Sequence, residues 1–317
     1  TGNYNVAIGA SALGVNTTAA SNTAVGYGSL TANTTGTTNV AVGSTAMAAN
    51  TTADNNTGIG AASMNGNTTG TRNTAVGSDS LKVNTTGNDN TAVGKGALTA
   101  NTTASNNTAV GKNALAANTT GANNTAVGKS ALDANTTGAS NTVLGADALS
   151  ADTQGSRSVA IGTSALEVQN FTTATNTYNV AVGFNAGAAI STGTLNTAVG
   201  GLSLDATTTG SYNTAVGYSA GGAITTGESN VCIGYNAGDA ITTGGANTGL
   251  GAGALGATTT AGNNVAVGFE ALGANTTGSL NTAVGRYALD ANTTGGDNVA
   301  IGADALGAAT TAGDNVA

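Results

Sequence analysis

The chain lacks histidine and tryptophan altogether and has a single cysteine among its 317 residues. Without histidine, neither a histidine-based catalytic triad nor an imidazole metal site can be built. One thiol excludes an intrachain disulfide framework, and we expect Cys232 to be a small buried residue. Because the carboxylates are also scattered rather than paired, the sequence predicts no enzymatic activity, no cofactor and no metal.

The chain also has few aromatic residues, no cluster of basic residues and no long apolar run. Only ten residues are aromatic, so a thick globular core is excluded. The net charge is −8 and no basic cluster occurs, which argues against nucleic acid as a partner. No run approaches the roughly 18 apolar residues that a membrane helix needs, so we expect no membrane insertion in this segment.

What the chain has instead is a 17-residue repeat that opens with Asn-Thr-Ala-Val-Gly or a close relative of it. Only the step from Ser158 to Asn179 is longer, at 21 residues. A sustained period is typical of a solenoid, in which each coil contacts its neighbours. We therefore predict one repeat shaft over residues 1–317, with a four-residue insertion within 158–178. The repeats start at positions 5, 22, 39, 56, 73, 90, 107, 124, 141, 158, 179, 196, 213, 230, 247, 264, 281, 298 and 315.

We number the positions of the repeat from one, its Asn, to seventeen. Positions two to four read as a strand, with two and four on one side and three on the other. Position four is always Val, Ile or Leu, and position three is Ala or Gly apart from Val143 and Cys232. We expect positions two and four to face the core. The small residues at position three then predict a second packed face, against other copies of the chain, and hence a homo-oligomer.

The second half of the repeat carries a correlated substitution at positions nine and twelve. Position nine is Leu or Met and position twelve is usually Asn, but three repeats have Gly and Ile there instead. The three pairs are Gly187 with Ile190, Gly221 with Ile224, and Gly238 with Ile241. Because close packing conserves the number of large core side chains, positions nine and twelve must reach the same interior space. Asn at positions one and twelve predicts stacked amide ladders.

These patterns predict an all-β solenoid or β-roll of about 18 stacked 17-residue coils. The second half of each coil is compatible with a helical turn or with a second strand. One coil cannot stand alone, because burying a Leu and a Val contributes roughly 1.5–3 kcal/mol each, whereas ordering each backbone residue costs about 1–2 kcal/mol. At about 4.8 Å per coil the stack is expected to form a rod on the order of 85 Å long.

Charged residues mark positions six, seven, ten, sixteen and seventeen as the solvent rim, with Asp152 as the exception. Three lysines share position six and are expected to be solvent-facing, with an anionic polysaccharide as the alternative partner. Aromatic residues at the same position later in the chain favour packing against a neighbouring chain, with stacking on sugar rings as the alternative. The insertion, within 167–178, is where specificity is expected. Candidate surface-contact residues are Lys95, Lys112, Lys129, Phe171, Phe184, Tyr218, Tyr235 and Phe269.

The full repeat, as in 124–138 and 281–295, resembles the repeats of phage tail-fibre-like proteins. The pentads at 5–9 and 158–162 are similar to the head repeats of trimeric autotransporter adhesins. The resemblance covers the whole chain and implies a stacked β-roll or β-helix, commonly trimeric, that serves as a shaft or an adhesive head. The 17-residue coil is longer than that of the autotransporter head, and residues 1–317 match only the repeats of these families, not their membrane-anchor region or self-cleaving chaperone domain.

The functional expectation is a non-enzymatic structural fibre, first a viral tail fibre or spike shaft that supports host attachment and belongs to the virion. The second reading is a bacterial surface adhesin or extracellular filament. The third is a carbohydrate-binding module that uses position six and the 167–178 loop. The expected partners are other copies of the chain, as a homotrimer, and a cell-surface glycan or receptor.

Overall fold

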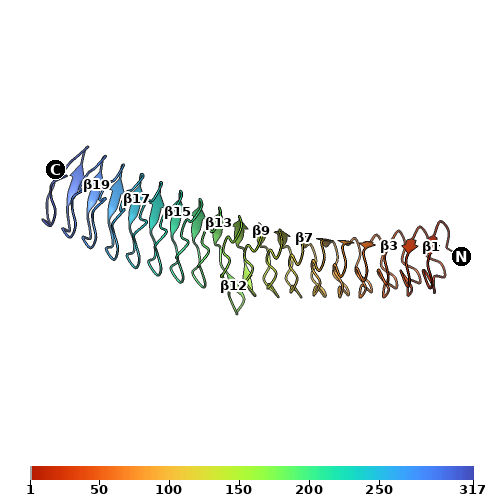
Figure 1. The fold of residues 1–317 in the computed structure, drawn as a ribbon. Coiled ribbons are helices and arrows are strands. Elements are labelled where there is room, and N and C mark those ends of the chain that lie inside the picture. The colour runs from red at the N-terminus through yellow and green to blue at the C-terminus, as the bar shows by residue number, and fades with distance from the viewer. Residues whose placement is uncertain (1) are drawn as a thin grey trace. The chain divides into compact units, whose positions relative to one another are not determined.

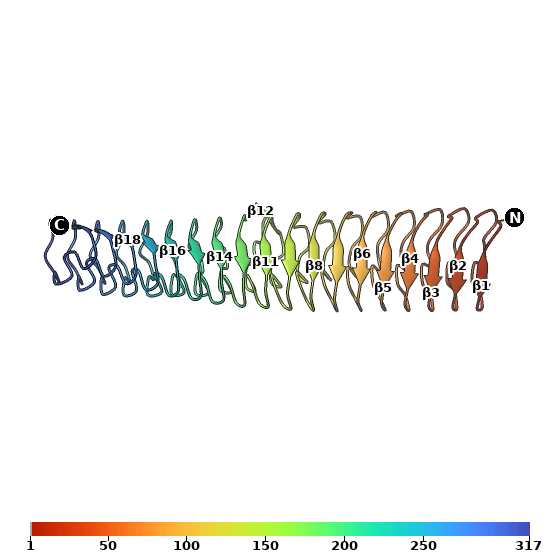
Figure 2. The same ribbon diagram turned by 90° about the horizontal axis from the view of Figure 1, so that it is seen from above.

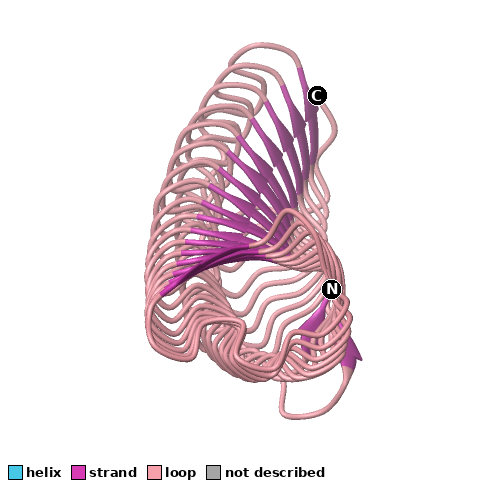
Figure 3. Ribbon diagram, turned by 90° about the vertical axis from the view of Figure 1, so that its right-hand side faces the viewer, coloured by secondary structure: helices cyan, strands magenta, loops and turns pink. Residues whose placement is uncertain are grey.

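The computed structural model describes residues 2–317, which form two compact units. Unit 1 comprises residues 2–157 and 171–176, and unit 2 comprises Ser158–Asn170 and Thr177–Ala317. Each unit is a stack of coils, and one three-residue strand of each coil contributes to a continuous sheet (Figure 1). The end-on view shows this sheet on one wall of the coil, loops around the rest of it, and a separate pair of short strands away from that wall (Figure 3).

The strands of each unit are parallel and in register (Figure 2). Each strand residue pairs with the one 17 positions away, as Val25 does with Val42, except between the first two strands of unit 2, where Val159 pairs with Val180 across 21 positions. Unit 1 contains β1 (Val6–Ile8), β2 (Thr23–Val25), β3 (Val40–Val42), β4 (Thr57–Ile59), β5 (Thr74–Val76), β6 (Thr91–Val93), β7 (Thr108–Val110), β8 (Thr125–Val127) and β9 (Thr142–Leu144). Unit 2 contains β11 (Val159–Ile161), β13 (Val180–Val182), β14 (Thr197–Val199), β15 (Thr214–Val216), β16 (Val231–Ile233), β17 (Thr248–Leu250), β18 (Val265–Val267), β19 (Thr282–Val284) and β20 (Val299–Ile301). Residues 2–317 contain no helix, so the predicted all-β, parallel β-solenoid is confirmed.

Backbone hydrogen bonds between coils continue beyond the strands, around the rest of the circumference. Gly28 N donates to Ala10 O in the preceding coil (3.0 Å), whereas Leu30 N donates to Ala46 O in the following one (3.1 Å). This alternation needs left-handed backbone at position nine, where Leu30 has a φ of 48°. The second half of the coil is therefore neither a helical turn nor a second strand. It is a turn-rich ladder that satisfies its peptide groups through its neighbours.

The predicted facing of the strand was wrong, because position three points into the coil. Ala24 and Ala126 are fully buried within the single chain, whereas the position-four residues Leu144 and Leu250 are 49 % and 44 % exposed. The interior is narrow: a Cβ placed on Gly58 would lie 2.9 Å from Met47 Cγ. Position three is small because the same coil fills the space opposite it, and no second chain is needed to explain it.

The exchange between positions nine and twelve is confirmed. A Cβ on Gly221 would lie 2.9 Å from both Ile224 Cδ1 and Leu204 Cδ2, so one volume serves all three positions. Ile224 and Leu204 are fully buried. Because Gly221 has a φ of 59°, glycine also relieves the strain that leucine accepts at position nine of other coils.

The two asparagine ladders are confirmed, and they converge on one carbonyl. Asn39 Nδ2 donates to Asn22 Oδ1 (3.2 Å) along the first ladder, and Asn50 Nδ2 donates to Asn33 Oδ1 (2.9 Å) along the second. Asn22 and Asn33 also both donate to Gly36 O, at 2.9 and 3.0 Å. Coils that have Asn at both positions are thus closed by two buried amides that bind the same turn and the neighbouring coil.

Asp152, the exception to the charge pattern, occupies position twelve in unit 1 and is buried. Its Oδ1 accepts hydrogen bonds from Gly155 N (3.0 Å) and Phe171 N (3.1 Å). Beside it β10 (Gly155–Ser156) pairs in parallel with β12 (Thr175–Asn176). The carboxylate therefore organises the inserted segment by accepting hydrogen bonds from two backbone amides. A charged oxygen makes stronger hydrogen bonds than the neutral amide oxygen of an asparagine would.

Unit 2 begins with a second compensated exchange. Ser158 replaces the longer Asn at position one, and Gln169 replaces the shorter Asn at position twelve. Gln169 Nε2 reaches Ser158 Oγ (3.0 Å), and its Oε1 accepts from Asn179 Nδ2 (2.8 Å). The longer side chain at position twelve thus makes up for the shorter one at position one, and the hydrogen bonds between the two positions are kept.

Candidate functional site

The candidate surface residues divide between the two units. In unit 1, Lys95, Lys112 and Lys129 are exposed at position six of three successive coils, and Lys129 Nζ lies 3.6 Å from Asp147. Phe171 is only 8 % exposed, so its prediction as a surface-contact residue was wrong. The insertion buries this ring instead of presenting it.

In unit 2 the four aromatic residues at position six are all exposed. Tyr218 and Tyr235 are stacked, with ring centroids 6.0 Å apart and planes 13° apart. Phe269 meets the edge of Tyr287, at 5.4 Å between centroids. Tyr287 comes from position seven, which is why alignment of position six alone missed it. The fourth residue is Phe184.

The local chain path explains why position six points outward. After each strand, glycine at position five takes a φ open only to glycine, 136° at Gly234 and 139° at Gly251. A Cβ on Gly234 would lie 2.6 Å from Gly251 O one coil further on. The backbone therefore leaves the sheet at once, and the next side chain, Tyr235 after β16 or Ala252 after β17, projects from the corner.

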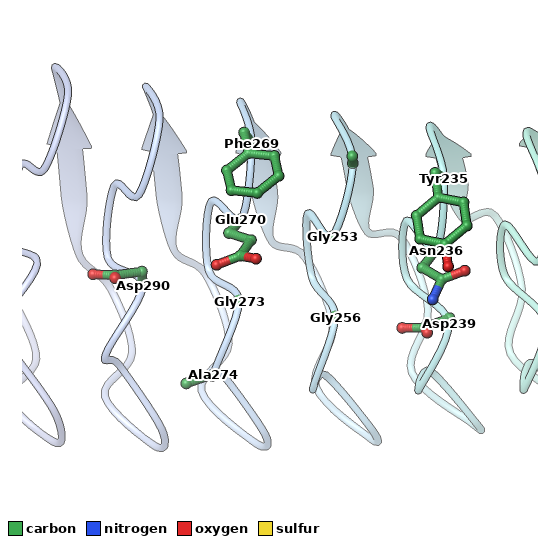
Figure 4. A pocket seen from close by; sticks show the side chains of 11 residues that line it. Tyr235, Asn236, Asp239, Gly253, Gly256, Phe269, Glu270, Gly273, Ala274 and Asp290 are labelled. Carbon is green, nitrogen blue, oxygen red and sulfur yellow. The ribbon is translucent and has the colours of Figure 1, made fainter.

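Between Tyr235 and Phe269 the surface is hollowed into a slot of about 480 Å³. The coil that lies between these two rings has Ala252, Gly253 and Gly256 at positions six, seven and ten. The preceding coil has Tyr235, Asn236 and Asp239 at these positions, and the following coil has Phe269 and Glu270 at the first two, so the small residues of one coil create the slot (Figure 4). The lining residues are Tyr235, Asn236, Asp239, Ala252, Gly253, Gly256, Phe269, Glu270, Gly273, Ala274 and Asp290.

Backbone hydrogen bonds fix the spacing of the slot walls. Gly253 N donates to Tyr235 O (3.0 Å), and Glu270 N donates to Ala252 O (3.0 Å). Both rings are therefore attached to a continuous ladder rather than to mobile loops. Two coil steps of about 4.8 Å place their attachment points roughly 10 Å apart.

The slot is rich in hydrogen-bond acceptors and has no cationic lining residue among those described. Its polar groups are the carboxylates of Asp239, Glu270 and Asp290 and the amide of Asn236. Burial raises the pKa of the Asp239 carboxyl. Such a surface suits a ligand that brings donors and no negative charge.

The arrangement of possible metal ligands and the state of the one cysteine complete the description of the reactive side chains. Over residues 2–317 no group of three or more His, Cys, Asp or Glu side chains is arranged to hold a metal ion. Cys232 is buried, as expected from the sequence, and burial raises its pKa to about 12. Its thiol therefore stays protonated and is a poor nucleophile.

Sequence reasoning found Tyr235 and Phe269 but missed the slot and its carboxylates. The signal was present in the aligned repeats as small residues at three outward positions of a single coil, Ala252, Gly253 and Gly256. Comparing one position at a time across the repeats does not show it. The slot depends on positions six, seven and ten of the same repeat being small together.

No family model matches the chain, and a search of curated proteins gives no match. Within residues 2–317 there is no helix of the length and hydropathy required to cross a bilayer.

Proposed function

We propose that this protein is a non-enzymatic structural fibre whose chains associate through the outward face of their strands. The observation that carries the proposal is the composition of that face. Position four is Val, Ile or Leu in every strand of both units, position two is Thr or Val, and neither position is ever charged. Nine consecutive strands make this stripe about 40 Å long in each unit. A contiguous exposed apolar surface of this extent is typical of an interaction site.

A second copy of the chain is the occupant that fits this face best. Its own stripe has the same spacing of about 4.8 Å between side-chain rows, so ridges of one copy enter the grooves of another along the whole stripe. A partner with any other period would lose register after a few coils. We propose a parallel homotrimer, the arrangement that the resemblance to fibre and adhesin repeats implies.

Within this function we propose a viral tail fibre or spike shaft that supports host attachment, with a bacterial surface adhesin or extracellular filament as the second reading. The support is the resemblance of the repeat, together with a core and backbone ladder suited to a mechanical role. Within each unit, coils are bonded to their neighbours through their strands and turns, and through the asparagine ladders where these are present. Load along the stack is thereby distributed over many parallel hydrogen bonds.

The test changes the outward stripe without changing the coil interior. Val76→Lys together with Val110→Lys places two charges at position four of unit 1, where both side chains are half-buried at the surface. We expect light scattering to show oligomers for the unaltered chain and monomers for the variant, with unchanged circular dichroism. Burying an unpaired charge in an apolar interface explains the loss.

The matched control is Thr31→Lys with Thr99→Lys, at position ten, which holds Lys82 naturally in another coil. This variant should associate like the unaltered chain. The proposal fails if the unaltered chain is monomeric at concentrations up to hundreds of micromolar, or if both double variants associate equally well.

A further inference from the structure

We propose that the slot between Tyr235 and Phe269 in unit 2 binds a neutral, linear polysaccharide that lies along the stack of coils. The proposal is independent of the fibre function, since the slot uses positions six, seven and ten and the apolar stripe uses positions two and four.

The two rings form a platform rather than a cage. Both are seen face-on from the same side in Figure 4, with the coil of Gly253 and Gly256 between them. Tyr235 and Phe269 are 61 % and 45 % exposed, so each ring is open to solvent. The apolar C–H face of a sugar ring stacks on such a surface, and two platforms in line favour an extended chain over a single small molecule.

Polar groups lie beside the rings, where sugar hydroxyls would reach them. Asn236 and Glu270 follow the two rings in sequence, Asp239 lies below Tyr235 in Figure 4, and Asp290 comes from the coil beyond Phe269. Carboxylates accept hydrogen bonds and cannot donate them when ionised. Hydroxyl groups therefore match this lining, and the volume of about 480 Å³ lies within the usual range for a ligand site.

Charge excludes an acidic polysaccharide. Unit 2 contains nine acidic residues, among them the three slot carboxylates, and a single basic residue, Arg286. That arginine is engaged with Asp304 (3.2 Å) and with the ring of Tyr287 (5.2 Å). An anionic chain would meet uncompensated carboxylates with no cation to bind it.

An organic ammonium group is the main competing ligand, because aromatic rings and carboxylates both attract cations. Its recognition requires ring faces directed at the charge from several sides. Here the two faces point the same way and are about 10 Å apart, which is two coil steps. The geometry thus favours a long, uncharged ligand.

The experiment measures binding of the full chain by calorimetry to neutral hexasaccharides, namely β-1,4-linked glucose, α-1,4-linked glucose and β-1,4-linked N-acetylglucosamine. Polygalacturonate and choline serve as the anionic and cationic probes. We expect at least one neutral hexasaccharide to bind and neither charged probe to do so. Tyr235→Ser and Phe269→Ser should each weaken that binding about tenfold, since each removes one stacking surface.

A third variant fills the slot instead of dismantling it. Ala252→Tyr adds a ring at a position that accepts tyrosine in neighbouring coils, so it should fold normally and abolish binding. The matched controls in unit 1 are Tyr27→Ser and Ala146→Tyr, also at position six, and both should bind as before.

The proposal is overturned if no neutral hexasaccharide binds at millimolar concentration or if only choline or polygalacturonate binds. It is equally overturned if the unit 1 controls lose as much affinity as the slot variants. Light scattering on the same samples reports the oligomeric state separately, so a failure of this proposal is distinguishable from a failure of the fibre proposal.

Discussion

Units 1 and 2 are built from the same 17-residue coil yet differ sharply in charge. Unit 1 carries six acidic and six basic residues and is neutral, whereas unit 2 carries nine acidic residues and one basic residue and holds the entire net charge of −8. At position six, unit 1 has a lysine stripe and unit 2 an aromatic one. The coil therefore fixes which positions face solvent and leaves their chemistry free, so that surface function can change along the chain without altering the fold.

The interiors of the two units differ at position twelve. In unit 1 the amide ladder is unbroken from Asn33 to Asn135, and each of these residues donates to the coil before it. In unit 2 it is interrupted by isoleucine in three coils and by Thr207 and Thr258 in two others, and an amide pair returns only at Asn275 and Asn292. Thr207 Oγ1 is buried without a hydrogen-bond partner. Position twelve thus carries a continuous polar ladder in one unit and a mixture of aliphatic and polar side chains in the other.

The largest expected effect comes from forcing the unit 1 residue into a unit 2 coil. Ile224→Asn removes a fully buried aliphatic side chain where Gly221 supplies no substitute, and its position-twelve neighbours Thr207 and Ile241 offer no amide ladder. A cavity and a poorly paired polar group together should lower the free energy of unfolding by about 3–5 kcal/mol. Denaturant unfolding followed by circular dichroism measures the loss.

The control for this change completes the exchange. Gly221→Leu with Ile224→Asn restores the unit 1 pattern and should recover most of the lost stability, whereas Gly221→Leu alone should destabilise by overpacking against Ile224. An unchanged unfolding midpoint in Ile224→Asn, or no recovery in the double variant, would contradict the shared-volume interpretation.

A smaller effect is expected from removing the polar side chain at position twelve, where unit 1 has a laddered asparagine and two coils of unit 2 have a threonine. Asn101→Ala in unit 1 removes the bonds from Nδ2 to Asn84 Oδ1 (2.9 Å) and Ala104 O (3.0 Å). It also removes one of the two acceptors of Asn118 Nδ2, which keeps its bond to Gly121 O. We expect a cost of about 2–3 kcal/mol.

The counterpart in unit 2 is Thr207→Val, which removes a buried hydroxyl that has no partner. It should be neutral or stabilising by up to about 1 kcal/mol, because no hydrogen bond is lost. Thermal unfolding of the two variants under one condition makes the comparison. Equal destabilisation by both substitutions would contradict this interpretation, because it would show that the asparagine ladder contributes no more stability than an unpaired threonine hydroxyl.

Much of this architecture was predictable because a repeat tests each position many times. The period, the strand, the solvent rim and the exchange between Gly221 and Ile224 all follow from restrictions repeated in many coils. The facing of the strand was not predictable from the alternation alone. Val at position four looks like a core residue, and Ala at position three looks like a contact, until the narrow interior around Met47 is seen.

Singular features were the hardest to predict, because they occur once. Asp152 appeared only as an exception to the charge pattern, and its role depends on Phe171 N, which lies far along the chain in the inserted segment. Gln169 compensates for Ser158 through a length match that no other repeat displays. The slot at Ala252 depends on three positions of one coil combined with its neighbours. Each requires knowledge of which atoms meet across coils.

The smallest expected effect concerns the pH dependence of stability and compares one carboxylate from each unit. Burial raises the pKa of Asp205 in unit 2, so the folded chain binds this proton more readily than the unfolded chain does. The ionised carboxylate therefore costs stability at neutral pH, and the cost disappears as the pH falls through the folded pKa toward the unfolded value of about 3.9. At pH 7, Asp205→Asn should raise the free energy of unfolding by less than about 1 kcal/mol after solvent screening, and the midpoint should rise accordingly. At pH 4 the substitution should have no such effect.

Asp79 in unit 1 has the opposite sign, because a hydrogen bond from Lys82 lowers its pKa. Its stabilising contribution is present above the unfolded pKa and is lost as the pH falls through the lower folded value. Asp79→Asn should therefore lower the midpoint slightly at pH 7, and the difference should vanish near pH 2. Thermal unfolding of both variants across this range decides the matter. If the two variants shift in the same direction at pH 7, partner and burial do not distinguish the carboxylates of the two units.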